Sequence, residues 1–371
     1  MIKTRLRRRA LTLTALLGLA ALSSHCASEQ EEEPALTPAD LGGQDPETVR
    51  LRASSMFGSL PAVMQSSKHT MSEAKVKLGR QLFYETRLSK NQDLSCNTCH
   101  DLLGFGVDMR TGSERVSLGH RNQRGTRNGP TVYNAASHFA QFWDGRAIDV
   151  EEQAKAPILN AVEMAMPSEA AAVTVIKSIP GYLPLFQAAF PGGRDPITYT
   201  NIGIAIGAFE RKLVTKDRFD RYITGETDAL KPSEVRGLYV FMRAGCPSCH
   251  NGASFGGSSY QKLGAIKTFS TSDTGRYAVT KLESDRYYFK VPSLRNVAET
   301  GPYFHDGSQA TLADAVRTMS EYQTISGKLD DEEIAAVVAF LGALTGELPM
   351  DYIVEPAKLA GSSTTPAPNP N

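Results

Sequence analysis

The chain has 371 residues, which is enough for two domains of ordinary size. Its 40 Lys and Arg residues balance its 40 Asp and Glu residues, and this zero formal charge argues against nucleic acid as a partner. Hydrophobic residues make up 41% of the sequence, so we expect a packed core, and 20 prolines with 31 glycines predict many turns and loops.

Residues 1–27 have the layout of a secretory signal peptide. Basic residues at positions 3–9 precede the apolar run Ala10–Leu22, which is too short for a comfortable membrane span. Cys26, the odd one of five cysteines, follows this run, as the lipidated cysteine of a bacterial lipoprotein would. The alternative is that Cys26 leaves with the signal peptide. The sequence therefore predicts export to the periplasm and leaves a lipid anchor at Cys26 open.

The next segment, residues 28–66, is polar and contains prolines among acidic residues, which predicts a linker. The predicted first domain covers residues 67–225 and the second covers residues 226–350. Residues 351–371 form a C-terminal tail, of which Gly361–Asn371 is rich in Ser, Thr, Pro and Asn and is predicted to be disordered.

Within these domains the apolar spacing predicts a mainly α fold with long functional loops. A capping box at Thr70–Glu73 opens one predicted helix, and Ser233 with Glu234 opens another. Gly79 and Phe83 of the first correspond to Gly237 and Phe241 of the second, so we expect two similar units. Further predicted helices are Glu169–Ile179, Thr200–Val214, Leu312–Met319 and Asp331–Leu344, whereas alternation typical of strands is confined to Tyr277–Val291.

Each predicted helix of this pair leads to a C-x-x-C-H motif, at Cys96–His100 and at Cys246–His250. Two thiols at this spacing can each add to one vinyl group of a haem, and the adjacent histidine then reaches the iron. A redox C-x-x-C pair or a zinc site are the alternatives, but neither explains the histidine after each motif. The motifs predict two covalently attached haem c groups. The attaching residues are Cys96, Cys99, Cys246 and Cys249, and the iron ligands are His100 and His250.

The chain also resembles the bacterial dihaem cytochrome c peroxidases over roughly residues 67–348. Beyond the haem motifs, the matching runs are Gly119–His120, Arg127–Thr131, Phe142–Ala147, Glu151–Ala154, Val162–Met164, Pro292–Asn296, Tyr303–Gly307 and Ala315–Met319. The resemblance implies two cytochrome-c-like domains, each with one covalently bound haem. The first would carry the peroxidatic haem, and the second would carry the electron-transfer haem.

The resemblance also implies roles for individual residues. Met319 would be the distal ligand of the second haem, since a thioether raises a haem's reduction potential. His120 would be a loop histidine that can cap the first iron and leave it on reduction, although about four residues more than usual separate it from His100. Packing in a helix and a surface loop are the ordinary alternatives for these two side chains.

Over the first haem, Glu163 corresponds to the acid–base residue and Gln153 to a residue that orients peroxide by hydrogen bonding. Trp143, the single tryptophan, would lie between the haems, as a relay or as a buried anchor. Asn128, Thr300 and Pro302 match residues that offer oxygens to a calcium ion. His305 is assigned no chemistry, and His138 is assigned to structure or surface.

The predicted function is therefore reduction of hydrogen peroxide to water by a dihaem c-type cytochrome peroxidase. Its electron donor would be a small c-type cytochrome or a blue-copper protein, and a homodimer stays open. Two alternatives remain: an electron-transfer dihaem cytochrome without peroxidase activity, and a protein-oxidising dihaem enzyme. The protein-oxidising relatives have tyrosine where this chain has Met319, which argues against the second alternative.

Overall fold

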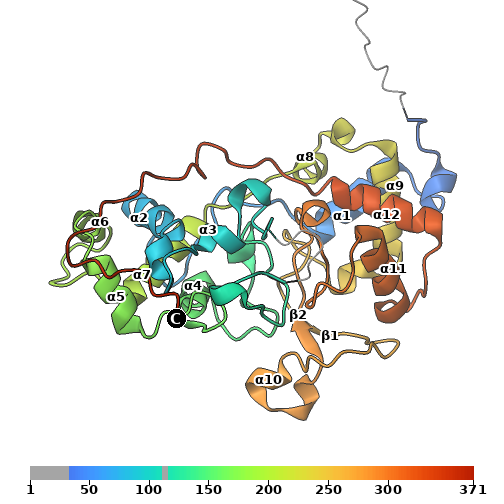
Figure 1. Ribbon diagram of the computed structural model, residues 1–371. Coiled ribbons are helices and arrows are strands. Elements are labelled where there is room, and N and C mark those ends of the chain that lie inside the picture. The colour runs from blue at the N-terminus through green and yellow to red at the C-terminus, as the bar shows by residue number, and fades with distance from the viewer. Residues whose placement is uncertain (1–32, 111–115) are drawn as a thin grey trace, which may run out of the picture. The chain divides into compact units, whose positions relative to one another are not determined.

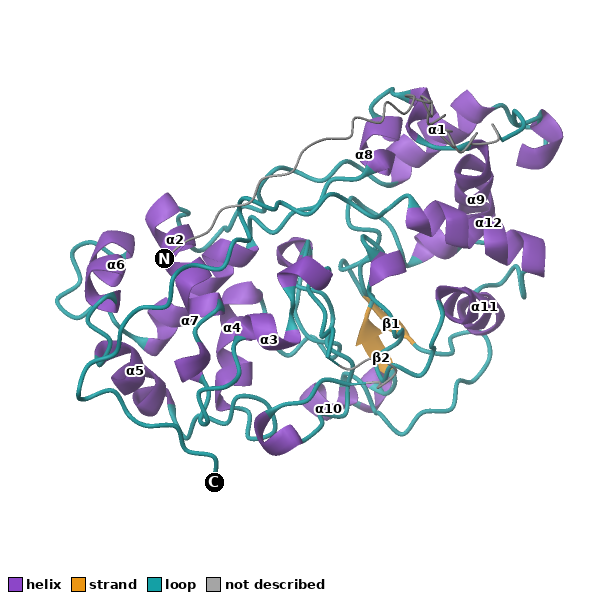
Figure 2. Ribbon diagram, turned by 45° about the horizontal axis from the view of Figure 1, so that its top comes forward, coloured by secondary structure: helices purple, strands orange, loops and turns teal. Residues whose placement is uncertain are grey.

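Helices dominate the computed structural model, which describes residues 33–110 and 116–371 (Figure 1). The α-helices are α1 (Pro46–Met56), α2 (Glu73–Phe83), α3 (Cys96–Cys99), α4 (Val150–Leu159), α5 (Glu169–Lys177), α6 (Tyr182–Ala189), α7 (Tyr199–Glu210), α8 (Arg218–Ile223), α9 (Pro232–Arg243), α10 (Tyr277–Thr280), α11 (Leu312–Gln323) and α12 (Asp331–Gly342). Two short antiparallel strands, β1 (Tyr260–Lys262) and β2 (Tyr288–Lys290), form the sheet. Figure 2 shows that much of the remaining chain is loop, as the sequence predicted.

Short 3-10 helices punctuate these loops at Pro38–Leu41, Thr86–Leu88, Leu102–Gly104, His120–Asn122, Ala135–Ser137, Thr227–Ala229, Cys246–Ser248, Glu283–Asp285 and Val297–Glu299. Within the described ranges, no helix combines the length and the apolar character needed to cross a membrane.

The same helix crossing occurs twice, between α2 and α7 and between α9 and α12. A Cβ atom on Gly79 would lie 1.8 Å from the carbonyl oxygen of Ala205, and one on Gly237 would lie 1.9 Å from that of Ala336. Both crossings therefore need glycine. The structure confirms the two similar units that these glycines predicted.

Each crossing is the centre of its own hydrophobic core. Helices α4, α5 and α6 complete the first core, and α1, α8 and α11 complete the second. An aromatic pair lies at each crossing: Phe83 with Phe209 at 5.3 Å between ring centroids, and Phe241 with Phe340 at 5.5 Å. Two cores of this kind confirm the predicted fold of two helical domains.

The prediction of a linker at residues 28–66 is wrong where the structure describes it. Asp45 caps α1 and Pro46 occupies its first turn, a common helix start that a reading of composition alone overlooks. Val49, Ala53 and Phe57 follow at helical spacing and are buried in the second core. This segment is therefore part of the second domain's packing.

The prediction of a disordered tail is also wrong. The C-terminal segment returns from α12 to α2 and α6, as the red trace shows (Figure 1). The hydroxyl of Tyr84 donates to the carbonyl of Ile353 at 2.6 Å, and the backbone N–H of Asn369 donates to that of Lys90 at 2.9 Å. Composition alone could not reveal that the first domain forms hydrogen bonds with the backbone of this polar segment.

Smaller differences concern the ends and types of elements. Ser72, not Thr70, caps α2, because its hydroxyl accepts from the N–H of Lys75 at 3.2 Å. The region Tyr277–Val291, predicted as strand, holds α10 and a 3-10 helix, and only its end pairs as β2. The other predicted helices agree with the structure to within a few residues at each end.

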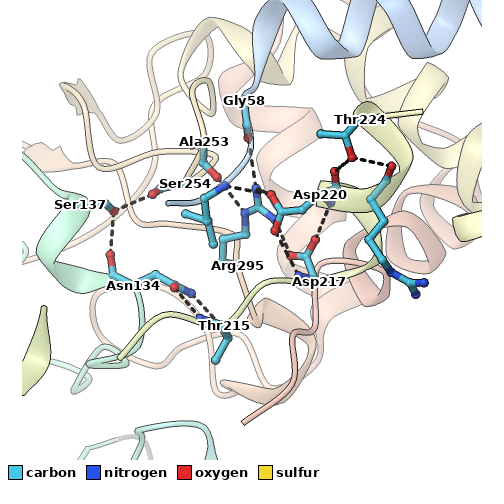
Figure 3. Close-up of polar contacts among 12 residues, drawn as sticks. Gly58, Asn134, Ser137, Thr215, Asp217, Asp220, Thr224, Ala253, Ser254 and Arg295 are labelled. Atoms are coloured by element: carbon cyan, nitrogen blue, oxygen red, sulfur yellow. Dashed lines mark hydrogen bonds and ion pairs between the residues drawn. The ribbon is translucent and has the colours of Figure 1, made fainter. Parts of the chain in front are cut away.

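Buried polar groups join the segment after α7 to both domains (Figure 3). The amides of Asn134 and Asn296 both donate to the hydroxyl of Thr215, at 2.9 and 2.8 Å. Beside them, the fully buried Arg295 bonds to the carboxylates of Asp217 and Asp220 at 2.5–3.1 Å. These contacts connect the two domains to each other through the segment that follows α7.

Candidate haem and catalytic sites

The two C-x-x-C-H motifs present their histidines in the same way. Nδ1 of His100 lies 3.2 Å from the carbonyl oxygen of Gly106, and Nδ1 of His250 lies 3.0 Å from that of Phe255. Burial lowers the pKa of both imidazoles, so both are neutral near pH 7. With the proton on Nδ1 engaged by a carbonyl, Nε2 of each ring is the nitrogen left to bind iron. The residues therefore fit axial ligation of a haem.

The first cysteine of each motif packs on the core of its own domain, Cys96 on the first and Cys246 on the second. Burial raises the pKa of Cys246 to about 12 and that of Cys99 to about 11. In the part of the chain that the structure describes, no group of three or more His, Cys, Asp or Glu side chains could hold a metal ion. The zinc alternative therefore has no support from the structure.

A largely apolar cavity of about 250 Å³ lies beside the second motif. Cys246, Cys249 and His250 line it, and Met319 of α11 lines it as well. The structure thus brings the predicted sulfur ligand and the predicted histidine ligand to one cavity, which suits a bound macrocycle with a ligand on each face.

In the first domain, the loop of His120 approaches the segment of Glu163. The backbone N–H of His120 donates to the carbonyl of Glu163 at 2.7 Å, and a Cβ on Gly119 would lie 2.0 Å from the carbonyl oxygen of Val162. Arg110 ties this loop to the haem motif, because one nitrogen of its guanidinium lies 3.4 Å from the sulfur of Cys99 and 2.8 Å from the carbonyl oxygen of Leu118. The structure therefore brings the backbones of His120 and Glu163, two predicted site residues, into contact.

The environment of Glu163 suits a group that exchanges protons. Burial raises its pKa, while the charge of Arg146 and a 2.9 Å hydrogen bond from the amide of Asn160 oppose that rise. A carboxylate whose pKa is raised in this way holds a proton more readily than an exposed one, which suits a group that takes up and releases protons. Gln153 lies on α4, the helix that Asn160 follows as its C-cap residue.

Trp143 lies at the boundary of the two domains. Its indole N–H donates to the carbonyl of Asn128 at 2.9 Å, and its ring centroid lies 6.4 Å from that of His305 in an edge-on arrangement. Trp143 also lines the cavity of the second motif. The residues predicted for calcium are near it: the amide nitrogen of Asn128 donates to the carbonyl of Pro302 at 2.6 Å. The hydroxyl of Thr300 instead lies 3.4 Å from the carbonyl oxygen of Val297.

Sequence reasoning missed three contributors. Asn160 is the hydrogen-bond partner of Glu163, and its place three residues upstream was a usable signal. His138 was assigned to structure or surface, and Lys290 was assigned nothing. Both line the cavity of the second motif, although they are 152 residues apart, and no local pattern relates them.

Two cytochrome-c-type units, each with a C-x-x-C-H motif whose histidine faces the site, define a dihaem cytochrome of the c type. Comparison with known proteins narrows this class. A family model described as "Di-haem cytochrome c peroxidase" matches residues 73–228, and one described as "Cytochrome c" matches residues 234–345.

Among curated proteins, the cytochrome c551 peroxidase of Pseudomonas aeruginosa is 42% identical over 325 residues, covering 85% of this chain and 91% of that protein. The cytochrome c551 peroxidase of Nitrosomonas europaea is 46% identical over 276 residues, covering 74% and 80%. A solved MauG-like protein associated with microbial copper homeostasis superposes with a TM-score of 0.69 at 29% identity, covering 80% of this chain and 97% of that chain. The chain belongs to the di-haem cytochrome c peroxidase family, as its motifs predicted.

Proposed function

We propose that the chain reduces hydrogen peroxide to water with electrons from a c-type cytochrome, and that its two domains divide this work. Relatives at 39–46% identity are named cytochrome c peroxidases, and the function predicted from the sequence agrees with them. The observation that supports this division is that different residues lie beside the two C-x-x-C-H motifs. Met319 faces the cavity of the second motif, whereas Glu163 and the His120 loop meet in the first domain.

Haem iron, when bound, supplies the redox chemistry, and the protein supplies positioning and protons. In the first domain, Glu163 takes a proton from peroxide and returns it to the departing oxygen. Asn160 holds the carboxylate through its amide, and Gln153 orients the substrate. Withdrawal of His120 opens the site. Two electrons and two protons then convert one peroxide molecule into two waters.

In the second domain, His250 and Met319 would hold the haem, which would supply the acceptor for electrons from outside. Thioether ligation suits this role, because it raises the reduction potential of a haem. The donor is a small c-type cytochrome or a blue-copper protein. Trp143 lines this cavity and donates a hydrogen bond to Asn128 of the first domain, so it would lie between the two haems when they are bound.

A calcium ion at Asn128, Thr300 and Pro302 belongs to the same proposal. Rotation of the Asn128 amide would turn Oδ1 toward the carbonyl oxygen of Pro302, and amide and carbonyl oxygens suit this hard cation. The exported protein works in the periplasm, and Cys26, the candidate lipid anchor, lies outside the described residues. A homodimer is the proposed assembly.

The protein-oxidising alternative has a relative to support it, since a methylamine utilization protein MauG is 33% identical over 84% of this chain. Met319 in the cavity of the second motif favours the peroxidase, because the protein-oxidising enzymes have tyrosine at this position. A plain electron-transfer cytochrome would keep both irons fully coordinated and would have no use for Glu163.

The decisive experiment compares Glu163→Gln with Glu169→Gln in holoprotein made with haem-maturation machinery. Glu169 is an exposed glutamate of the same domain, so its variant controls for the loss of one carboxylate. We expect Glu163→Gln to keep both covalent haems and to lose about 10²–10⁴-fold in peroxide turnover. The raised pKa of Glu163 also predicts that wild-type turnover falls as pH drops through it, because the protonated carboxyl cannot take a proton.

Equal turnover in both variants would contradict the role of Glu163. Two attached haems with no peroxide turnover in the half-reduced wild type would contradict the peroxidase and leave the electron-transfer cytochrome.

A further inference from the structure

Lys290 is a buried cation whose position has no evident structural reason. It ends β2, its side chain is buried, and burial lowers its pKa to about 8. Within residues 33–110 and 116–371, no carboxylate lies within ion-pair distance of Lys290. An ammonium group without a counter-charge is costly in such a place. Its burial therefore calls for an anion that the chain itself does not provide.

His138 is the neighbour of this ammonium group. Nζ of Lys290 lies 3.3 Å from Nδ1 of His138. Burial first, and then the charge of Lys290, hold the pKa of His138 well below its usual value, so the imidazole is neutral. Because Nδ1 accepts from Lys290, the ring proton is on Nε2. This buried Nε2 has no hydrogen-bond partner in the described part of the protein.

The two side chains thus present donors and no acceptor. The ammonium group keeps N–H donors beyond the one directed at His138, and the Nε2–H of His138 is a further, unused donor. Both residues line the cavity that also contains Cys246 and His250. The rest of that cavity is largely apolar. An apolar body that carries a carboxylate is the occupant that this combination fits.

We infer that Lys290 and His138 form the site that receives a carboxylate side chain of the second haem. A haem is a large apolar ring with two such carboxylates, so one molecule satisfies both the apolar lining and the donor pair. This inference rests on the assignment of Cys246, Cys249 and His250 proposed above. It adds two residues to the haem site that no motif identified.

The site bears on the reduction potential of the second haem. A cation beside the carboxylate offsets negative charge near the iron and so favours the reduced state. The corresponding position in the first domain is Asn128, two residues before Pro130 as Lys290 is two before Pro292, and it carries no charge. Lys290 therefore raises the potential of the second haem, which is the direction that an electron-accepting haem requires.

The test is a spectroelectrochemical titration of full-length holoprotein with Lys290→Gln, Lys290→Arg and Lys262→Gln. Lys262 is the control, because it is an exposed lysine on the paired strand β1. We expect Lys290→Gln to lower the equilibrium constant for reduction of the second haem about tenfold, which is about 59 mV for a one-electron couple. Lys290→Arg should recover most of this loss, and Lys262→Gln should change the constant less than about threefold.

A second measurement needs no variant and remains decisive if Lys290→Gln fails to mature. The haem-propionate bending bands in the resonance Raman spectrum of the wild type should shift in D₂O, because the carboxylate accepts from exchangeable N–H groups. Equal potentials in Lys290→Gln and Lys262→Gln would overturn the inference, and so would propionate bands that D₂O leaves unmoved. Absence of haem from the Cys246–His250 peptide of the wild type would instead overturn the assignment itself.

Discussion

The two domains share the same local structure around their C-x-x-C-H motifs and differ in the residues opposite the histidine. Both have a glycine at the helix crossing and a histidine held by a carbonyl. The matching turns Phe142–Gly145 and Phe304–Gly307 both begin and end at positive φ. Counting onward from these turns, Pro157 of α4 occupies the place that Met319 has in α11.

This difference changes the ligand that each domain can offer to an iron. Proline offers no side-chain donor to an iron, whereas methionine offers its sulfur. The first domain then continues into the segment that carries Glu163, whose carboxyl is buried and bonded to Asn160. Under the proposed function, this scaffold would serve as an electron port in the second domain and as a catalytic centre in the first. Each prediction below changes one of the paired positions.

The largest expected effect is at Tyr133 and Arg295, which are both buried and lie three residues after the corresponding prolines Pro130 and Pro292. Arg295→Met leaves the buried carboxylates of Asp217 and Asp220 without their cation, so we expect a loss of about 3–5 kcal/mol in the free energy of unfolding. Tyr133→Phe removes one hydrogen bond to the carbonyl of Leu102 and should cost about 1–2 kcal/mol. Denaturant unfolding of both holoproteins measures the difference, and equal losses would show that the ion cluster contributes little.

A second difference between the domains is Glu210 of α7, which has Leu341 as its counterpart in α12. Burial first, and then repulsion by Glu151, raise the pKa of Glu210 from 4.5 to about 8. Between these values the unfolded chain has lost this proton and the folded chain keeps it, so wild-type stability falls as pH rises.

Glu210→Gln should remove this dependence. The variant should become more stable than the wild type by an amount that grows above pH 4.5 and reaches on the order of 4 kcal/mol near pH 8. Unfolding free energies at several pH values check this, and a constant difference across that range would show that Glu210 ionises normally in the folded protein.

A smaller effect is expected at the two helix crossings. Gly79→Ala and Gly237→Ala each place a Cβ less than 2 Å from a backbone carbonyl oxygen, so the helices must separate. Each substitution should cost about 1–3 kcal/mol. Because each crossing belongs to one core, Gly79→Ala should disturb the spectrum of the first haem and Gly237→Ala that of the second. Changes in both spectra from either variant would contradict the independence of the two cores.

The sequence predicted the parts of this structure that local chemistry determines. The haem motifs, the paired glycines and most helices follow from spacing alone, and the family resemblance located Met319 and Glu163. Contacts between distant segments could not be predicted in this way. Residues 34–64 and the C-terminal tail are polar in composition, yet they are held by the two cores and by backbone hydrogen bonds. The pair of His138 and Lys290 likewise exists only in the folded chain.

The most direct test of the division between the domains is a redox titration of the wild type and of Met319→Leu. We expect the wild type to titrate in two well-separated steps. Met319→Leu removes the sulfur and keeps the packing, so the higher-potential step should lose at least about tenfold in its equilibrium constant, or about 59 mV. The lower-potential step should not move. A shift of the lower step, or of neither step, would contradict the account in which Met319 is a ligand of the electron-accepting haem.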